Sequence, residues 1–360
     1  MIQTIFRIHP TINIARVGTS EEFYIAPETA AGEIIPSDPP LYGGLPIRPG
    51  TDDTPITAED LRDTQGRVKR QAARFRLFAY DGPQTRYPEG GGREVTIGAT
   101  VDTPQGSKTI RDIIWMVHLA NKKANNYRIT SENGQEEGIV AYENGRTPPI
   151  RNAAFGSDLG APDRLSRLVI DAGPRALPAS SGGDVTIHFN DKTIPATFGT
   201  ARNPIVPLST YPVSFPFMHF RLIEQHGRID TLGEMTIERH SGRLLVVGGY
   251  GRAAGILGPD GKPPPLDDAV DNDFWFDDTS DGPVRALVIF DDGSSVEAVG
   301  AWFVCTDPGY APQVRNVVST WDDIYSTWVE KLDLIPDLFS NGQYNPDFPA
   351  AFDRDVQPIF

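Results

Sequence analysis

The residues "LGEMTIERHSGRLLVVGGYG" (232–251) predict a β-hairpin. Polar and apolar residues alternate on both sides of His240-Ser241-Gly242, where glycine can supply the positive φ of a tight turn. A second hairpin is predicted where "VRALVIF" (284–290) and "SVEAVGAWFV" (295–304) flank Asp291-Asp292-Gly293, because Asp-Gly between alternating strands is a strong turn signal. The two hairpins predict an antiparallel core against which the preceding residues pack.

The segment between the hairpins, "DNDFWFDDTSDGPV" (271–284), combines carboxylates with three aromatic residues. Its acidic residues are Asp271, Asp273, Asp277, Asp278 and Asp281. A cation site with oxygen ligands is one interpretation. However, aromatic residues occupy the middle positions, where a helix-loop-helix calcium site needs alternating carboxylates and a glycine. We therefore predict structural turns in which Asp and Ser bind nearby backbone N–H groups above buried aromatic rings, and no metal site.

Length and composition limit the classes of protein that this chain can belong to. Its 360 residues exceed what one core usually serves, so two domains or one subdivided domain are expected. The 35 glycines and 32 prolines suit a turn-rich β architecture. The net charge of −15 argues against a nucleic-acid partner, since binding phosphates requires clustered Lys and Arg.

Neither a membrane span nor a secretory leader is indicated. The sequence has no run of 18 apolar residues, and "MIQTIFRIHP" (1–10) alternates like a strand. We expect a cytoplasmic protein, or one exported without a recognisable signal peptide. Cys305 is the sole cysteine, which excludes an intrachain disulfide and a cysteine-based zinc cluster within this chain.

Five further stretches are predicted as strands or hairpins. A long loop at 26–58, rich in Pro, Gly, Asp and Thr, lies between the first and the second of them. They are "TIFRIHPTINIARVG" (4–18), "RVKRQAARFRLFAY" (67–80) with one basic face, "IIWMVHLA" (113–120), "LSRLVID" (165–171) and a hairpin in "DVTIHFNDKTIPATF" (184–198) around Asn190-Asp191.

Three polar residues beside these strands are candidates for function. Arg16 is interpreted as a buried arginine paired to a carboxylate or carbonyl, with a substrate clamp as the alternative. His118 and Lys122 are compatible with an acid-base pair, although a single histidine beside an apolar run is more often a hydrogen-bonded core residue.

After Pro312 the apolar period changes to that of an amphipathic helix. The stripe comprises Val314, Val317, Val318, Trp321, Ile324, Tyr325, Trp328, Val329 and Leu332. The predicted fold class is α+β, mainly β, with layered antiparallel sheets, hairpins and this C-terminal helix. Residues 1–310 form the β-rich region, subdivided near 220, and residues 311–360 form a helical connector toward a missing second half. The apolar finish at Phe360 suggests an interrupted chain.

The common motifs of soluble enzymes are absent from the sequence. It has no phosphate-binding loop, His-Glu-x-x-His, Gly-x-Ser-x-Gly or kinase signature. "GGYGRAAG" (248–255) lacks the spacing of a dinucleotide fingerprint, so we interpret it as a turn after a strand that carries Tyr250.

Eight strings in the chain nevertheless resemble one family in sequence and spacing. They are "IHPTINIARVG", "RVKRQAARFRLFAYD", "WMVHLANKKA", "RLVIDAGPR", "LGEMTIERHSGRLLVVGGYG", "DNDFWFDDTSDGPV", "AWFVCTDPGYAP" and "RDVQPIF". Together they resemble the first half of the quinoprotein amino-acid oxidases, the family of lysine ε-oxidase and glycine oxidase, whose cofactor is cysteine tryptophylquinone.

The resemblance implies oxidative deamination of an amino acid. The substrate amine condenses with a quinone carbonyl, a carboxylate removes a carbon-bound proton, and oxygen reoxidises the cofactor to give hydrogen peroxide. It also implies a second half or partner chain that supplies the quinone cysteine and tryptophan, an oligomer, and a flavoprotein that matures the quinone. Tyr250 falls where the family places an aromatic residue facing the substrate channel, and a packing tyrosine is the alternative.

Cys305 does not look like the cofactor cysteine. It lies three residues from Trp302 in a predicted strand, and an odd separation sends the two side chains to opposite faces. Its string resembles a structural strand of the family, so we expect a buried, inert thiol, with no quinone and no catalytic residue in this chain. The leading functional hypothesis is the non-quinone chain of a tryptophylquinone amino-acid oxidase, inactive alone. The alternative is a non-catalytic binding or scaffold protein derived from the same family.

Overall fold

The structure, a computed structural model, describes residues 4–29, 34–35, 41–80, 92–128, 145–191, 196–199, 203, 205–223, 228–239, 241–266, 272–308 and 320–351. The chain divides into two compact units. One unit comprises Met1–Glu28 and Pro46–Tyr310, and the other comprises Thr29–Leu45 and Ala311–Phe360. The first unit is the larger of the two and is described first.

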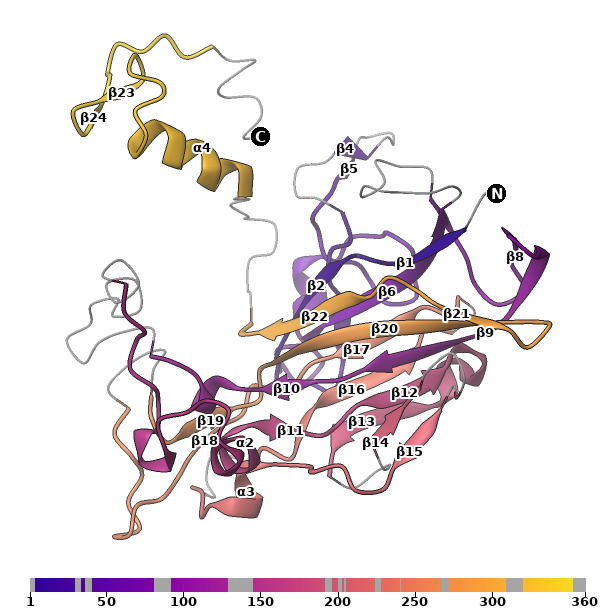
Figure 1. Cartoon of the computed structure of the whole chain (residues 1–360), viewed down its shortest axis with the longest axis horizontal. Helices are drawn as coiled ribbons and strands as arrows, with labels where there is room; N and C mark the ends of the chain where they lie inside the picture. Colours follow the sequence, from indigo (N-terminus) through magenta and orange to yellow (C-terminus); the bar gives the residue numbers. More distant parts are fainter. Residues whose placement is uncertain are drawn as a thin grey trace. The chain divides into compact units, whose positions relative to one another are not determined.

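The first unit is built on one large, mainly antiparallel sheet (Figure 1). Its longest path runs through β11 (Ile170–Asp171), β10 (Ala120–Asn121), β20 (Ser280–Phe290), β22 (Ala301–Thr306), β2 (Ile12–Arg16), β6 (Arg70–Tyr80), β17 (Leu244–Val247), β16 (Thr231–Ile237) and β13 (Thr186–Asn190). Seven strands join beside this path: β1 (Ile5–His9), β3 (Phe23–Ile25), β7 (Arg93–Glu94), β8 (Thr100–Thr103), β9 (Gly106–Val117), β12 (Arg175–Pro178) and β21 (Ser295–Glu297). The mainly β fold predicted from the sequence is confirmed.

Short elements complete the described residues. The remaining strands form two-stranded pairs: β4 (Ile34–Ile35) with β5 (Leu41–Tyr42), β14 (Ala196–Phe198) with β15 (Val206–Leu208), β18 (Ala253–Gly255) with β19 (Trp275–Asp277), and β23 (Phe339–Ser340) with β24 (Gln343–Tyr344). The α-helices are α2 (Pro162–Leu168), α3 (Pro216–His219) and α4 (Thr320–Glu330). The 3-10 helices are η1 (Ala58–Leu61), η2 (Lys123–Asn125), η3 (Ala153–Phe155) and η4 (Ala179–Asp184).

Both predicted hairpins are present. In the first, β16 and β17 pair antiparallel, and Gly242 has a φ of +72° as the turn requires, while His240 lies outside the described residues. In the second, β20 turns at Gly293, whose φ is +81°, into β21. The predicted strand at 295–304 is divided into β21 and β22, and both pieces pair with β20.

The prediction of a strand at Leu165–Asp171 was wrong for most of its length. The segment belongs to α2 as far as Leu168, and only Ile170 and Asp171 are in a strand. Pro162 occupies the first turn, where its missing N–H costs nothing, and Asp163 pairs with Arg167 one turn later at 2.8 Å. The helix buries Leu168 against the core, so tertiary packing decides the structure of Leu165–Leu168, whereas the residues that follow keep their strand preference.

The predicted hairpin around Asn190-Asp191 was also wrong. β13 does precede this point, but it pairs with β16, while β14 pairs with β15. Each predicted strand therefore has another partner, because a turn signal specifies a reversal of the chain only where the two flanking strands are also each other's best packing partners.

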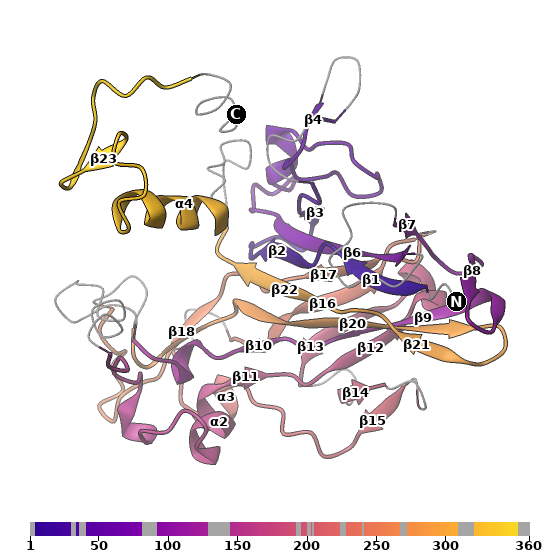
Figure 2. The ribbon, with the colours of Figure 1, turned by 45° about the horizontal axis from the view of Figure 1, so that its top comes forward.

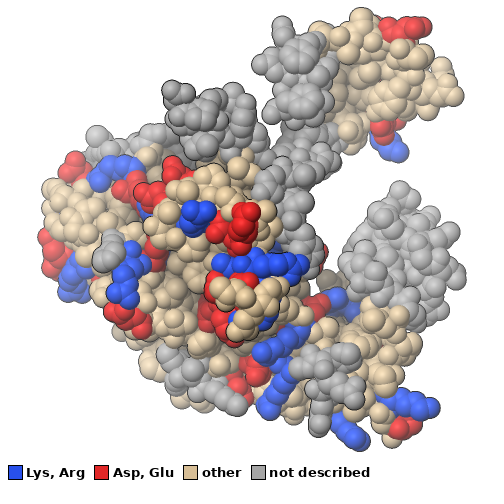
Figure 3. Space-filling model, turned by 180° about the vertical axis from the view of Figure 1, so that it is seen from behind, with Lys and Arg blue, Asp and Glu red and all other residues tan. Residues whose placement is uncertain are grey.

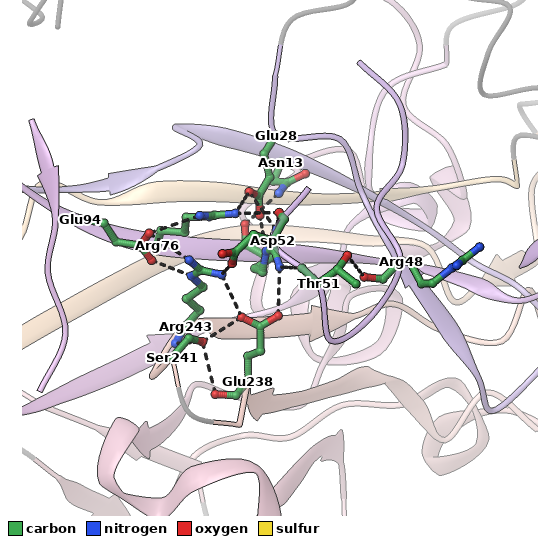
Figure 4. A network of polar contacts seen from close by, with 11 residues as sticks. Asn13, Glu28, Arg48, Thr51, Asp52, Arg76, Glu94, Glu238, Ser241 and Arg243 are labelled. Atoms are coloured by element: carbon green, nitrogen blue, oxygen red, sulfur yellow. Dashed lines mark hydrogen bonds and ion pairs between the residues drawn. The ribbon is translucent and has the colours of Figure 1, made fainter. Parts of the chain in front are cut away.

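The basic face predicted for residues 67–80 is buried by carboxylates from other elements (Figure 4). The fully buried guanidinium of Arg74 binds Glu28 at 2.5 Å and Glu238 at 3.0 Å. Arg243 binds Glu94 at 2.6 Å and also contacts Glu238. Burial of Glu94 opposes ionisation of its carboxyl group. The hydrogen bond from Arg243 and the positive charge of Arg243 outweigh this burial and hold the pKa of Glu94 below its usual range. This network joins β6, β7 and the β16–β17 hairpin.

In the second unit, α4 covers part of the predicted C-terminal helix. Val314, Val317 and Val318 lie outside the described residues, as does the side chain of Trp321. In the described part of the stripe Val329 is buried, whereas Trp328 is partly exposed. The role of the stripe as a packing surface remains a prediction. Among the described residues, none of the helices has the length and apolar content that a membrane span requires.

Candidate functional site

The segment Gly248–Gly251 follows β17, carries Tyr250 and passes beside Cys305 of β22 and Asp278, which lies between β19 and β20. A Cβ atom at Gly248 would overlap the Sγ atom of Cys305, and one at Gly249 would lie 2.6 Å from the carboxylate of Asp278. Gly251 has a φ of +71°, which disfavours other residues. The glycines of the turn that the sequence predicts after this strand therefore bring its backbone into contact with two buried side chains.

The carboxylate of Asp278 binds the backbone of the same segment. Its Oδ2 accepts the N–H of Tyr250 at 2.6 Å, and its Oδ1 accepts the N–H of Arg252 at 3.0 Å. The carboxylate is buried, and this burial raises its pKa to about 6 although the two N–H bonds favour its ionised form. Asp278 therefore fixes the backbone on both sides of Gly251.

The ring of Tyr250 lies against two guanidinium groups. The Cζ atom of Arg70 is 4.4 Å from the ring centroid and that of Arg252 is 5.0 Å from it, both within range of a cation–π interaction. The hydroxyl donates to Oε2 of Glu21 at 2.7 Å. Burial and this hydrogen bond raise the pKa of Tyr250 to about 12, so the phenol is neutral and can donate across the physiological pH range.

Arg70, which supports the tyrosine, is itself fully buried and fixed by several acceptors. It donates to the backbone carbonyls of Ser20 at 3.0 Å and Glu21 at 2.7 Å, and to the carboxylate of Glu234 at 3.0 Å. A guanidinium with this many hydrogen-bond acceptors has a fixed position against the tyrosine ring. Tyr250 is therefore an oriented, half-buried aromatic side chain in a charged setting.

The comparisons with known proteins identify the family. Residues 9–305 match the family model described as L-lysine epsilon oxidase N-terminal. This chain belongs to the L-lysine ε-oxidase family. It is 31% identical over 360 residues to an L-lysine 6-oxidase of Marinomonas mediterranea, in an alignment that covers 98% of this chain and 41% of that protein.

Solved structures of the family agree with this assignment. The chain resembles the crystal structure of the L-Lys ε-oxidase from Marinomonas mediterranea with a TM-score of 0.61, and the Schiff-base intermediate of that enzyme with L-Lys with a TM-score of 0.62, both at 28% identity. Each match covers 98% of this chain and 44% of the other. The chain thus spans less than half the length of the family members that it matches.

The quinone cofactor implied by the sequence resemblance does not fit Cys305. Its thiol is buried, and this burial, with the nearby charge of Asp278, raises its pKa well above the usual range. Trp302 lies on the opposite face of β22, where its indole N–H donates to Asp281 at 3.0 Å. The two side chains are therefore not placed for a cross-link, and no step of a quinone reaction is assigned to them.

The carboxylates between the hairpins mainly bind residues distant in sequence. Asp273 contacts Arg128 at 3.2 Å and Asp277 contacts Lys123 at 2.7 Å, whereas Asp271 lies outside the described residues. Of the three aromatic residues in this segment, only Phe276 is fully buried. Within the described ranges, no group of three or more His, Cys, Asp or Glu side chains is arranged to hold a metal ion.

The polar candidates beside the strands have other partners than a substrate. Arg16 donates to the backbone carbonyl of Asp307 at 2.9 Å, so the predicted carbonyl partner is present, but the residue is only partly buried and not buried as predicted. His118 does not pair with Lys122, which is exposed; its Nε2 lies 2.9 Å from Asp171 and 3.1 Å from the hydroxyl of Tyr211.

No pattern in the sequence indicated the cluster around His118. Tyr211 donates to the second oxygen of Asp171 at 2.8 Å, and burial raises the pKa of this tyrosine. Both partners are more than 50 residues from His118, so no local pattern connects them. Because all three side chains bind one another, the cluster is explained as a hydrogen-bonded support for β11.

Proposed function

We propose that this chain is the quinone-free half of a tryptophylquinone-dependent amino-acid oxidase that releases hydrogen peroxide. The single observation that carries the proposal is the family match, which covers 98% of this chain but only 41% of its L-lysine 6-oxidase relative. The placement of its one cysteine supports it, because Cys305 is buried and points away from Trp302. The quinone cysteine and tryptophan then belong to residues outside this sequence.

Tyr250 is the residue that we assign to the substrate channel of the assembled oxidase. The fixed orientation of its ring over Arg70, and the bond from its hydroxyl to Glu21, support a role in sorting amino acids by size or shape. A hydrophobic pocket discriminates between substrates that differ by one methylene group by about 1–3 kcal/mol.

The experiment is co-purification of the tagged chain with a second polypeptide carrying the quinone residues. We expect the isolated chain to have its sequence mass, no quinone absorbance and no redox-cycling stain, and only the pair to release peroxide from an amino acid. Trp321→Asp combined with Trp328→Asp should abolish pairing if α4 lies in an obligate interface. If the chain is a monodisperse monomer that does not bind the added second polypeptide, the result would instead favour the scaffold alternative.

The role of Tyr250 is tested in the assembled enzyme. Tyr250→Ala should change the ratio of kcat/KM between a small and a long amino acid by about tenfold or more, whereas Tyr250→Phe, which keeps the ring, should change it less. Tyr344→Ala is the matched control, because Tyr344 also donates to a glutamate, Glu330, at 2.6 Å. Equal losses of kcat/KM for every amino acid in Tyr250→Ala would contradict substrate sorting.

A further inference from the structure

Strands β2 and β22 expose apolar side chains on the face that points away from the core. They pair in parallel, with Ile12 beside Trp302 and Ile14 beside Val304. Ile12 is 61% exposed, Ile14 is 46% exposed and Trp302 is 42% exposed. The opposite face of the same two strands, which includes Phe303, is buried.

This apolar face extends onto the neighbouring strand β20. Pro283 pairs with Trp302 and is only partly buried. Further along the same face of β20, Leu287 and Ile289 are buried in a separate apolar cluster with Ile114 and Met116 of β9. Strands β2, β22 and β20 lie side by side in the sheet (Figures 1 and 2). On the outward face, Arg285 separates the covered apolar residues Leu287 and Ile289 from the more exposed residues around Trp302. We call the exposed part of this outward face, Ile12, Ile14, Pro283, Trp302 and Val304, the outer apolar face.

Polar groups surround the outer apolar face. Asp281 accepts the indole N–H of Trp302, and Arg285 forms an ion pair with Glu297. Elsewhere, on the face of the molecule seen in Figure 3, acidic and basic side chains are interspersed. A contiguous apolar patch with a tryptophan and a polar rim has the anatomy of a protein–protein interface, whereas isolated exposed apolar residues would need no explanation.

We propose that the outer apolar face is the docking surface for the quinone-bearing half of the oxidase. This inference rests on the proposed function. The alignments leave more than half of each matched family member uncovered, and this remainder is the partner that we assign to the outer apolar face. A second copy of this chain fits less well, since two chains of net charge −15 repel each other.

Docking can be measured through a single introduced thiol, because the natural cysteine is buried. The full chain carrying Ile12→Cys is co-expressed with the part of the Marinomonas mediterranea L-lysine 6-oxidase that lies beyond the match, supplied as a separate polypeptide. Maleimide should label this thiol about tenfold more slowly in the complex than in the free chain. The matched control is Leu165→Cys on α2, where the native side chain is 43% exposed, and its labelling rate should not change.

Charge variants test the energetics of the same face. Ile12→Asp and Trp302→Asp should each weaken binding by about tenfold or more, as expected for the centre of an interface, and Leu165→Asp should not. No co-purification, a complex in which labelling at position 12 is unchanged, or a dimer of this chain that Trp302→Asp dissociates would each overturn the proposal. A complex that protects the face but releases no peroxide would support the docking surface and contradict the proposed function.

Discussion

The carboxylate of Asp278 illustrates how one residue can fix the backbone of a loop that is distant in sequence. Its two oxygens each accept one backbone N–H from the loop that carries Tyr250, and both donors lie more than 25 residues away in sequence. The sequence analysis placed Asp278 in turns that bind nearby N–H groups, which identifies the right kind of bond but not its partner. Only the pairing of β18 with β19 brings the loop and the carboxylate together.

The pKa of Asp278 predicts a specific pH dependence. Because the folded-state pKa, about 6, lies above the unfolded value near 3.8, the folded protein binds more protons between these two pH values. The contribution of Asp278 to stability is therefore fully present below about pH 4 and is lost as the pH rises through 6. About two pKa units correspond to roughly 3 kcal/mol.

Urea unfolding of the wild type and of Asp278→Asn between pH 4 and pH 7 measures this effect. We expect the wild type to gain roughly 2–3 kcal/mol relative to the variant as the pH falls, whichever of the two is more stable at pH 7. A difference between the two proteins that stays constant over this pH range would show that the carboxyl group titrates normally.

Among the elements, the sequence predicts best where local turn chemistry and strand partners coincide. The β16–β17 and β20–β21 hairpins were found because Gly242 and Gly293 lie between strands that do pair with each other. The hairpin at Asn190 failed because its strands pair elsewhere. The basic face of β6 was recognised, but its burial depends on Glu28, Glu94 and Glu238, which come from three distant segments, and a pattern within one strand cannot reveal that.

The charge network on β6 predicts a large effect from one substitution. Arg74→Met should lower the free energy of unfolding by about 3 kcal/mol, because Glu28 and Glu238 lose the fully buried cation that they share and keep only Arg76 and Arg243 as partners. Arg48→Met is the control, since the Arg48–Asp60 pair is exposed and should contribute no more than about 1 kcal/mol. Similar denaturation midpoints for the two variants would mean that the buried network is not a major source of stability.

The acidic segment between the hairpins carries a prediction about metals. We expect 1 mM calcium or magnesium to leave the melting temperature unchanged, because Asp273 and Asp277 are paired with Arg128 and Lys123. A site with a Kd of about 10 µM would add about 2.7 kcal/mol at that concentration by mass action. A rise of several degrees in differential scanning calorimetry would therefore reveal a cation site that the ion pairs do not suggest.

At the scale of the whole molecule, family resemblance predicts more than composition does. Length and glycine content indicate a large β-rich protein, but the eight matching strings are what point to the amino-acid oxidases, and the match over residues 9–305 shows the family. The partner of the outer apolar face could not be predicted in this way. The alternation in β2 marks Ile12 and Ile14 as one face, yet only the structure shows that this face is exposed.

The parallel pairing of β2 with β22 has a consequence for synthesis of the chain. Arg16 and Thr306, which meet at the end of this pair, are 290 residues apart. At about 5–20 residues per second, a ribosome needs roughly 15–60 s to make the second strand after the first. During that interval β2 has no neighbour on that edge, and the isoleucines of a nascent strand are open to chaperones and to the wrong partners. Pairing of β2 with β22 therefore occurs late in the synthesis of this protein. Its timing is set by the rate of translation and not by the intrinsic rate of strand pairing.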